Sequence, residues 1–142
     1  MAATTVPKRT RRLGEHQGDS PHALGVKGAT KIPQGAIAVN NAGVMANATT
    51  ALNLIVMGVA RDTYDNSLGG DNAIMGEAEA GDFLVNNSAS TDLITAADVG
   101  KDCYLVDNQT VAKTDGGGTR SRAGKIVKCD AEGLYVRLGL GF

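Results

Sequence analysis

Short apolar runs separated by Gly, Asn and Asp fill the sequence from Ile32 onward, and this texture constrains the fold more than any other feature. The chain has 19 glycines in 142 residues, roughly twice the usual share of ~7%. Glycine favours turns, bulges and short strands over long helices. With five aromatic residues and no Trp, the core must be built from Val, Ile, Leu and Ala. We therefore expect a mainly β protein.

The alternation of apolar runs and turn residues predicts eight strands. The segment LNLIVMGVA is ambiguous, because its apolar residues fit a helical stripe as well as a strand, but Gly58 and the β-branched residues favour a strand. One helical turn is expected at Thr95 to Asp98, where the Thr-x-x-Asp spacing suits a capping box. The predicted strands are residues 36–39, 43–46, 54–60, 72–79, 82–86, 102–107, 122–129 and 133–138.

The clearest local prediction is a C-terminal hairpin. Leu134, Val136 and Leu138 alternate with Tyr135 and Arg137, a pattern that predicts one buried face and one solvent-facing face. The preceding apolar run ends before a loop at residues 130–133, whose glycine suits a left-handed turn position. The register of this hairpin is therefore well specified.

Charge divides the chain into a basic beginning and an acidic remainder. Residues 1–31 carry six basic and two acidic side chains, a net charge of +4, whereas the rest carries eight basic and thirteen acidic side chains, a net charge of −5. Apolar residues within the first part are few and without period, and Gly and Pro interrupt it. We predict a basic, flexible, extended N-terminal arm at residues 1–31 and a β-rich domain at residues 32–142.

Several function classes are not expected from the residues present. Both histidines, His16 and His22, lie in the predicted arm, where they cannot hold the fixed geometry that a catalytic triad requires. Zinc ligand spacing is absent, and Cys103 and Cys129 are expected to be free thiols. No stretch approaches the ~20 apolar residues of a membrane span, and no secretory signal is recognisable. We expect no enzyme activity, no cofactor, no metal and no membrane association, and synthesis in the cytoplasm.

Three segments resemble a family of tailed-bacteriophage head proteins, the capsid decoration or cement proteins. They are GAIAVNNAGVMANATT, GVARDTYDNSLGGDNAIMGEAEAGDFLVNNS and DLITAADVGKDCYLVDNQTVAKTDGGGTRSRAGKIVKCDAEGLYVRL. The resemblance implies a small β-barrel or β-sandwich that binds the major capsid protein at local threefold positions, often as a homotrimer. It also implies a structural protein on the outer surface of the virion that stabilises the mature head.

The basic arm carries the candidate binding residues, an inference from charge rather than from the family. An extended basic segment can lie along an acidic protein surface and become ordered on binding. A solvated tail without function is one alternative. A nucleic-acid-binding phage protein that contacts phosphates through the arm is another, although nucleic acid is not the expected partner, and a head fibre or adhesin base is a third. The predicted partner-binding residues are Lys8, Arg9, Arg11, Arg12, Leu13, Leu24 and Val26.

Overall fold

A computed structural model describes residues 2–10 and 21–141 of the chain. The described residues form a mainly β protein in which helix is limited to two single 3-10 turns, η1 (Ser90–Asp92) and η2 (Ala96–Asp98). The strands are β1 (His22–Gly25), β2 (Thr30–Ile32), β3 (Ile37–Asn41), β4 (Val44–Asn47), β5 (Leu54–Ala60), β6 (Tyr64–Asn66), β7 (Met75–Glu79), β8 (Gly81–Val85), β9 (Asp102–Leu105), β10 (Val111–Ala112), β11 (Arg122–Asp130) and β12 (Gly133–Leu138).

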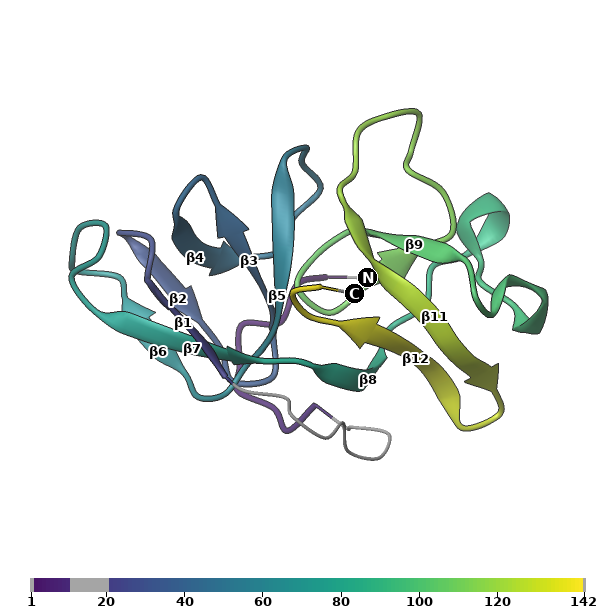
Figure 1. Ribbon diagram of the computed structural model, residues 1–142, viewed down its shortest axis with the longest axis horizontal. Helices are drawn as coiled ribbons and strands as arrows, with labels where there is room; N and C mark the ends of the chain where they lie inside the picture. The colour runs from purple at the N-terminus through teal and green to yellow at the C-terminus, as the bar shows by residue number, and fades with distance from the viewer. Residues whose placement is uncertain (1, 11–20, 142) are drawn as a thin grey trace.

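Two five-stranded antiparallel sheets make up the body, and each is built from a continuous stretch of sequence. The first has the order β1-β7-β5-β3-β4 and the second the order β10-β9-β11-β12-β8. A small third sheet pairs β2 with β6. Figure 1 shows the two large sheets side by side, with β7 leading directly into β8 from one sheet to the other. Ala80 alone separates these two strands.

Each large sheet curls until its two edges touch at one point. In the first sheet, the residue that follows β1 forms a parallel bridge with β4, Val26 to Met45. In the second, the residue that follows β8 forms a parallel bridge with the residue before β10, Asn86 to Thr110. One bridge does not make a closed barrel, so the fold is a sandwich of two curled sheets, and the sandwich half of the fold prediction is confirmed.

The interior contains two apolar clusters, one on each side of the first sheet. The larger lies between the two sheets and includes Ile37, Val39, Val56, Phe83, Ile126 and Val136. The smaller lies in the concave side of the first sheet and includes Val26, Ile32, Ala38, Met45 and Met57. Strand β5 is buried on both faces except at Ile55. Burial on both faces explains why its sequence is apolar throughout rather than alternating.

The strand predictions agree with the structure for eight of the elements. The predicted segments correspond to β3, β4, β5, β7, β8, β9, β11 and β12, with ends that differ by up to three residues. The capping box is confirmed: the Thr95 N–H donates to Asp98 Oδ2 over 2.9 Å, and the Thr95 side chain accepts from the backbone of Asp98. Strands β1, β2, β6 and β10 were not predicted, and they have only two to four residues each.

The C-terminal hairpin forms as predicted between β11 and β12, but the prediction of a wet face is wrong at Tyr135. Leu134, Val136 and Leu138 are buried, and so is Tyr135, at 0% exposure. Tyr135 lies between Lys128 and Leu84 on the neighbouring strands, and the Lys128 ammonium lies 5.7 Å from its ring centre. The long Lys128 stem therefore covers an aromatic ring that alternation alone would expose.

The predicted boundary at residue 31 is also wrong in structural terms. Strand β1 pairs in register with β7, from His22 opposite Ala78 to Gly25 opposite Met75. Strand β2 pairs with β6, and the turn between β1 and β2 is tied by hydrogen bonds to Asp71 and Gly69. The β-rich body therefore starts no later than His22. The paired residues are more than thirty positions apart in the sequence, so local composition does not indicate this pairing.

Candidate partner-binding site

The structure divides the predicted partner-binding residues among different environments. Val26 is completely buried and Leu24 packs against the same apolar cluster, so both belong to the core of the first sheet. Lys8 is half-buried against the body, and Arg9 is exposed. Arg11, Arg12 and Leu13 lie outside the described residues. Among the predicted residues that the structure describes, only Arg9 presents an exposed cationic side chain to a partner.

Residues 2–10 lie on the protein's own body, held by side chains from the second half of the chain and by backbone carbonyls from the first. Asn108 is the main contact, at 2% exposure. The Thr4 N–H donates to Asn108 Oδ1 over 2.8 Å, and Asn108 Nδ2 donates to the Thr4 carbonyl over 3.2 Å. An amide side chain that bonds both polar atoms of one residue recognises the peptide backbone rather than a side chain.

The turn that carries Asn108 is fixed by further contacts between the two sheets. The Asn108 carbonyl accepts from the Ile37 N–H of β3 over 2.7 Å. Its side-chain Nδ2 also donates to Asn47 Oδ1 at the end of β4, over 2.9 Å. On the other side, the Asn86 N–H donates to the Gln109 carbonyl over 2.8 Å. The turn is therefore held in place by the body independently of residues 2–10.

Gln109 and Lys8 make a second set of contacts along the segment. The Gln109 amide group donates to the Ala2 carbonyl, and its Oε1 accepts from Lys8 Nζ over 3.1 Å. Burial lowers the pKa of the Lys8 ammonium, and the negative charge of Asp107 partly opposes this effect. An ammonium held by a neutral amide in its own fold is less available to an acidic partner than sequence analysis assumes.

The far end of the segment is held beside the turn at Gln34 and Gly35. The Lys8 N–H donates to the Gln34 carbonyl over 2.9 Å, and the Thr10 hydroxyl donates to the Gly35 carbonyl. Gly35 has a φ of +82°, and a Cβ at this position would lie 2.3 Å from the Lys8 carbonyl oxygen. Glycine is therefore required here both by the backbone conformation and by the close approach of the segment.

A pocket of about 470 Å³ opens beside this segment. Thr4 and Thr5 of the segment line it together with Ala48, Thr49 and Val106 of the body. Lys31 and Asp107 provide charged groups of opposite sign to the same pocket. The segment thus forms part of a concave surface at the junction of the two sheets.

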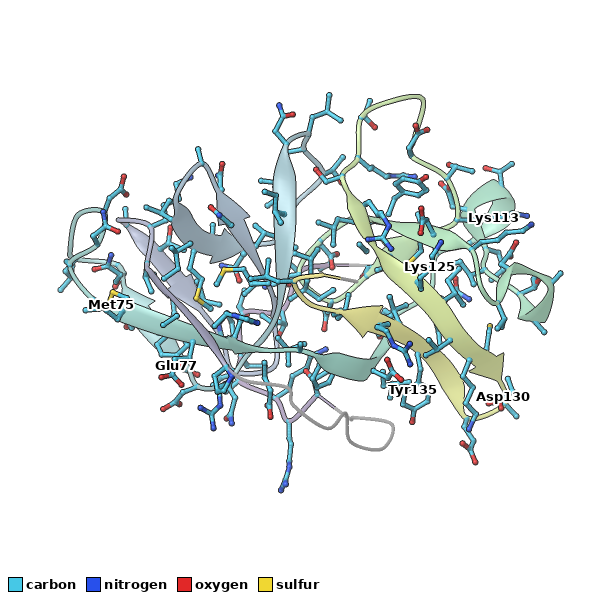
Figure 2. All side chains as sticks on the ribbon, viewed as in Figure 1. Met75, Glu77, Lys113, Lys125, Asp130 and Tyr135 are labelled. Atoms are coloured by element: carbon cyan, nitrogen blue, oxygen red, sulfur yellow. The ribbon has the colours of Figure 1, made fainter. Side chains whose placement is uncertain are left out.

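Outside this site, Glu77 of β7, which is labelled in Figure 2, has a structural role. It forms an ion pair with Arg61, Oε2 to Nη1 at 2.7 Å. Among the described residues, no group of three His, Cys, Asp or Glu side chains could hold a metal ion. The part of the chain that the structure describes also contains no helix long and apolar enough to cross a membrane. Cys103 and Cys129 are free thiols, as expected.

Sequence analysis did not identify Asn108, Gln109 or Gly35 as binding residues. The sequence Asp-Asn-Gln-Thr at residues 107–110 signals a turn, and nothing in that pattern indicates that the turn faces a segment a hundred residues earlier. Comparison with protein-family models, with curated proteins and with solved structures finds no match for this chain. The resemblance to capsid decoration proteins therefore stays a prediction.

Proposed function

We propose that this chain is a structural decoration (cement) protein of a tailed-bacteriophage head. It binds the major capsid protein at local threefold positions on the outer surface of the virion, as a homotrimer, and stabilises the mature head without enzymatic activity. The proposal rests on the sequence resemblance, and the sandwich architecture that the resemblance implies is the one observed.

The structural observation that supports the proposal is the extended segment at residues 2–10. It lies outside both sheets, is bound by polar side chains at their junction, and leads into the basic run at residues 8–12. A folded body whose sequence carries a basic run next to this segment suits attachment to an acidic protein surface. Lys8, Leu24 and Val26 act within the protein's own fold, so binding to capsid falls to Arg9, Arg11, Arg12 and Leu13.

Charge alone gives each copy little affinity. Exposed ion pairs contribute about 0.2–1 kcal/mol each, and they are screened at physiological salt, where the Debye length is about 8 Å. Several copies that bind one lattice together convert weak contacts into stable attachment. Apolar contacts, for which Leu13 is the candidate, are needed beside the charges, because ordering the arm costs roughly 1–2 kcal/mol for each residue fixed.

Cosedimentation with expanded heads that lack decoration protein, at physiological salt, tests the proposal. The intact chain is expected to sediment with heads at saturating, symmetric occupancy. Replacing Arg9, Arg11 and Arg12 by Ala should reduce occupancy several-fold. The matched control replaces three exposed basic residues that do not line the pocket, Lys27, Arg61 and Lys125, by Ala and should bind as the unaltered protein does.

Two results would overturn this assignment. The first is an intact chain that stays in the supernatant at every head concentration. The second is an intact chain that binds duplex or single-stranded DNA in a salt-sensitive manner through the same arginines but ignores heads, which would favour the nucleic-acid-binding alternative.

A further inference from the structure

The site around Asn108 recognises a peptide backbone and is built before any peptide occupies it. The Asn108 carbonyl accepts a hydrogen bond from Ile37 of β3, and the Gln109 carbonyl accepts one from Asn86. The turn therefore keeps its shape independently of residues 2–10. Asn108 Oδ1 accepts from the Thr4 N–H, and the side chain is 2% exposed. If the segment left with nothing in its place, a largely buried amide oxygen would lose this partner, at a real cost in stability.

The segment that fills this site is held by polar contacts more than by apolar ones. Val6, its largest apolar side chain, is 65% exposed, and Pro7 is also exposed. Contacts that are mainly hydrogen bonds to the backbone can be made equally well by an identical segment from another molecule. No deep apolar anchor ties residues 2–10 to their own body.

Chain length permits such an exchange. Eleven residue steps connect Thr10 to Pro21, and a chain of that length spans up to roughly 36–40 Å when extended. An exchange is therefore limited to neighbouring molecules whose sites lie within that span. Exchange of one element between identical copies keeps every native contact and adds only the assembly of the copies, so it is a low-cost route to a symmetric oligomer.

We propose that residues 2–10 of one copy occupy the Asn108, Gln109 and Gly35 site of a neighbouring copy, so that the arms link the subunits of the oligomer. This inference rests on the proposed function, because a decoration protein acts as a set of symmetric copies. The pairing is heterologous: each copy donates its arm to one neighbour and receives an arm from another, which closes into a ring at a threefold axis.

Thiol crosslinking between two differently tagged chains tests the exchange. Thr5 of the segment and Thr49 of the body are both exposed and line the same pocket. One chain carries Thr5→Cys and the other carries Thr49→Cys. Both carry Cys129→Ser, and Cys103 is fully buried. The two chains are coexpressed at full length and treated with a short reagent that joins two thiols.

The expected product is a covalent heterodimer that contains both tags. A matched control replaces Thr49→Cys by Thr91→Cys, which is also exposed but does not line the pocket. This control should give at least tenfold less heterodimer. Adding Asn108→Ala to the Thr49→Cys chain should lower the yield, while thermal unfolding of each variant verifies that it folds.

Three results would overturn the exchange. They are a monomeric protein in solution by light scattering, equal heterodimer yields for Thr49→Cys and Thr91→Cys, or a Thr5→Cys, Thr49→Cys double variant that crosslinks only within single chains. A monomer would also remove the homotrimer from the proposed function, whereas the other two results leave it intact. Attachment to heads is measured separately by cosedimentation.

Discussion

Arg137 of β12 and Asp82 of β8 lie directly opposite each other and share two parallel hydrogen bonds. Arg137 Nε donates to Asp82 Oδ1 over 2.8 Å, and Nη2 donates to Oδ2 over 3.1 Å. The Asp82 side chain is only 9% exposed. We predict that Asp82→Ala lowers the free energy of unfolding by about 1–3 kcal/mol, because it leaves a partly buried guanidinium without this partner.

Urea unfolding followed by circular dichroism measures this effect. The matched control is Glu132→Gln, which removes the exposed ion pair with Lys128 on the same hairpin. It should leave the unfolding midpoint almost unchanged, because exposed pairs contribute little. Equal midpoints for Asp82→Ala and Glu132→Gln would show that the Arg137 contact does not stabilise the sheet.

A second prediction concerns the close approach of β11 to β12. A Cβ on Gly124 would lie 1.9 Å from the carbonyl oxygen of Arg137, which is a backbone atom that cannot move alone. Gly124→Ala should therefore destabilise the protein by at least about 1–3 kcal/mol. Gly70→Ala is the control, since no heavy atom lies within 4 Å of that position. Thermal unfolding compares the two variants, and similar melting temperatures would contradict the register described for this pair.

A third prediction follows from Asp98 at the η2 turn. The hydrogen bond from the Thr95 N–H, followed by the nearby Lys113 and Lys101 ammonium groups, holds the pKa of the Asp98 carboxyl below its usual value despite burial. The folded pKa is thus below the unfolded one, near 3.9. The stabilising contribution is complete above the unfolded pKa and is lost as the pH falls through the folded pKa.

Asp98→Asn should therefore lower the urea midpoint at pH 7 and have progressively less effect as the pH is lowered from about 5 towards 2. Asp92 and Asp102 also have lowered pKa values, chiefly through hydrogen bonds from Thr114 and Lys125. Acid destabilisation is accordingly reduced in the variant rather than abolished. A difference from the unaltered protein that stays constant over this pH range would argue against the assignment.

The two cysteines should differ in reactivity. Burial raises the pKa of the Cys103 thiol to about 12, and its side chain is fully buried. Burial also raises the pKa of Cys129, which is only half-buried. In native protein at pH 8 a thiol reagent should label Cys129 alone, since the thiolate is the reactive form. Mass spectrometry of Cys129→Ser should show no label before unfolding and one label in urea; rapid native labelling of this variant would disprove the burial of Cys103.

Limited proteolysis distinguishes a folded body that starts at His22, as observed, from one that starts at residue 32, as composition predicts. Lys27 and Lys31 lie in and beside the paired strands β1 and β2, with the Lys27 N–H donating to the Met45 carbonyl over 2.9 Å. Trypsin should therefore leave the bonds after Lys27 and Lys31 intact in native protein and cut them in urea. Early cleavage after Lys31, found by peptide mapping, would support the predicted arm at residues 1–31 instead.

Elements with a strong local signal were predictable from sequence, and elements that depend on distant partners were not. Leu134, Val136 and Leu138 alternate along one strand, and the Thr95 and Asp98 spacing defines its own cap, so both were predicted correctly. Strand β1 and the residue after it have no such local signal. Gly25 pairs with a residue fifty positions later, and Val26 pairs with a residue nineteen positions later. Tyr135 was misplaced because its cover comes from the Lys128 side chain on the neighbouring strand.

The candidate site was predictable only in part, for a similar reason. The charge excess of residues 1–31 drew attention to the arm, and Arg9 is exposed as a binding residue must be. Asn108 and Gln109 act through backbone contacts with Thr4 and Ala2, and recognition of a backbone leaves no mark on the sequence of the recognised segment. Val26 was assigned to the arm because its burial depends on a curled sheet whose edges meet.

The division of the two sheets at Ala80 has a consequence for synthesis. Residues 22–79 contain every strand of the first sheet and the whole of the smaller apolar cluster, so this half can bury a core of its own as soon as it leaves the ribosome. The second half has no separate cluster of its own: Phe83, Ile126 and Val136 belong to the larger cluster, which also contains side chains of the first sheet. The nascent chain can therefore fold from its beginning, with the earlier half serving as the template on which the later half condenses.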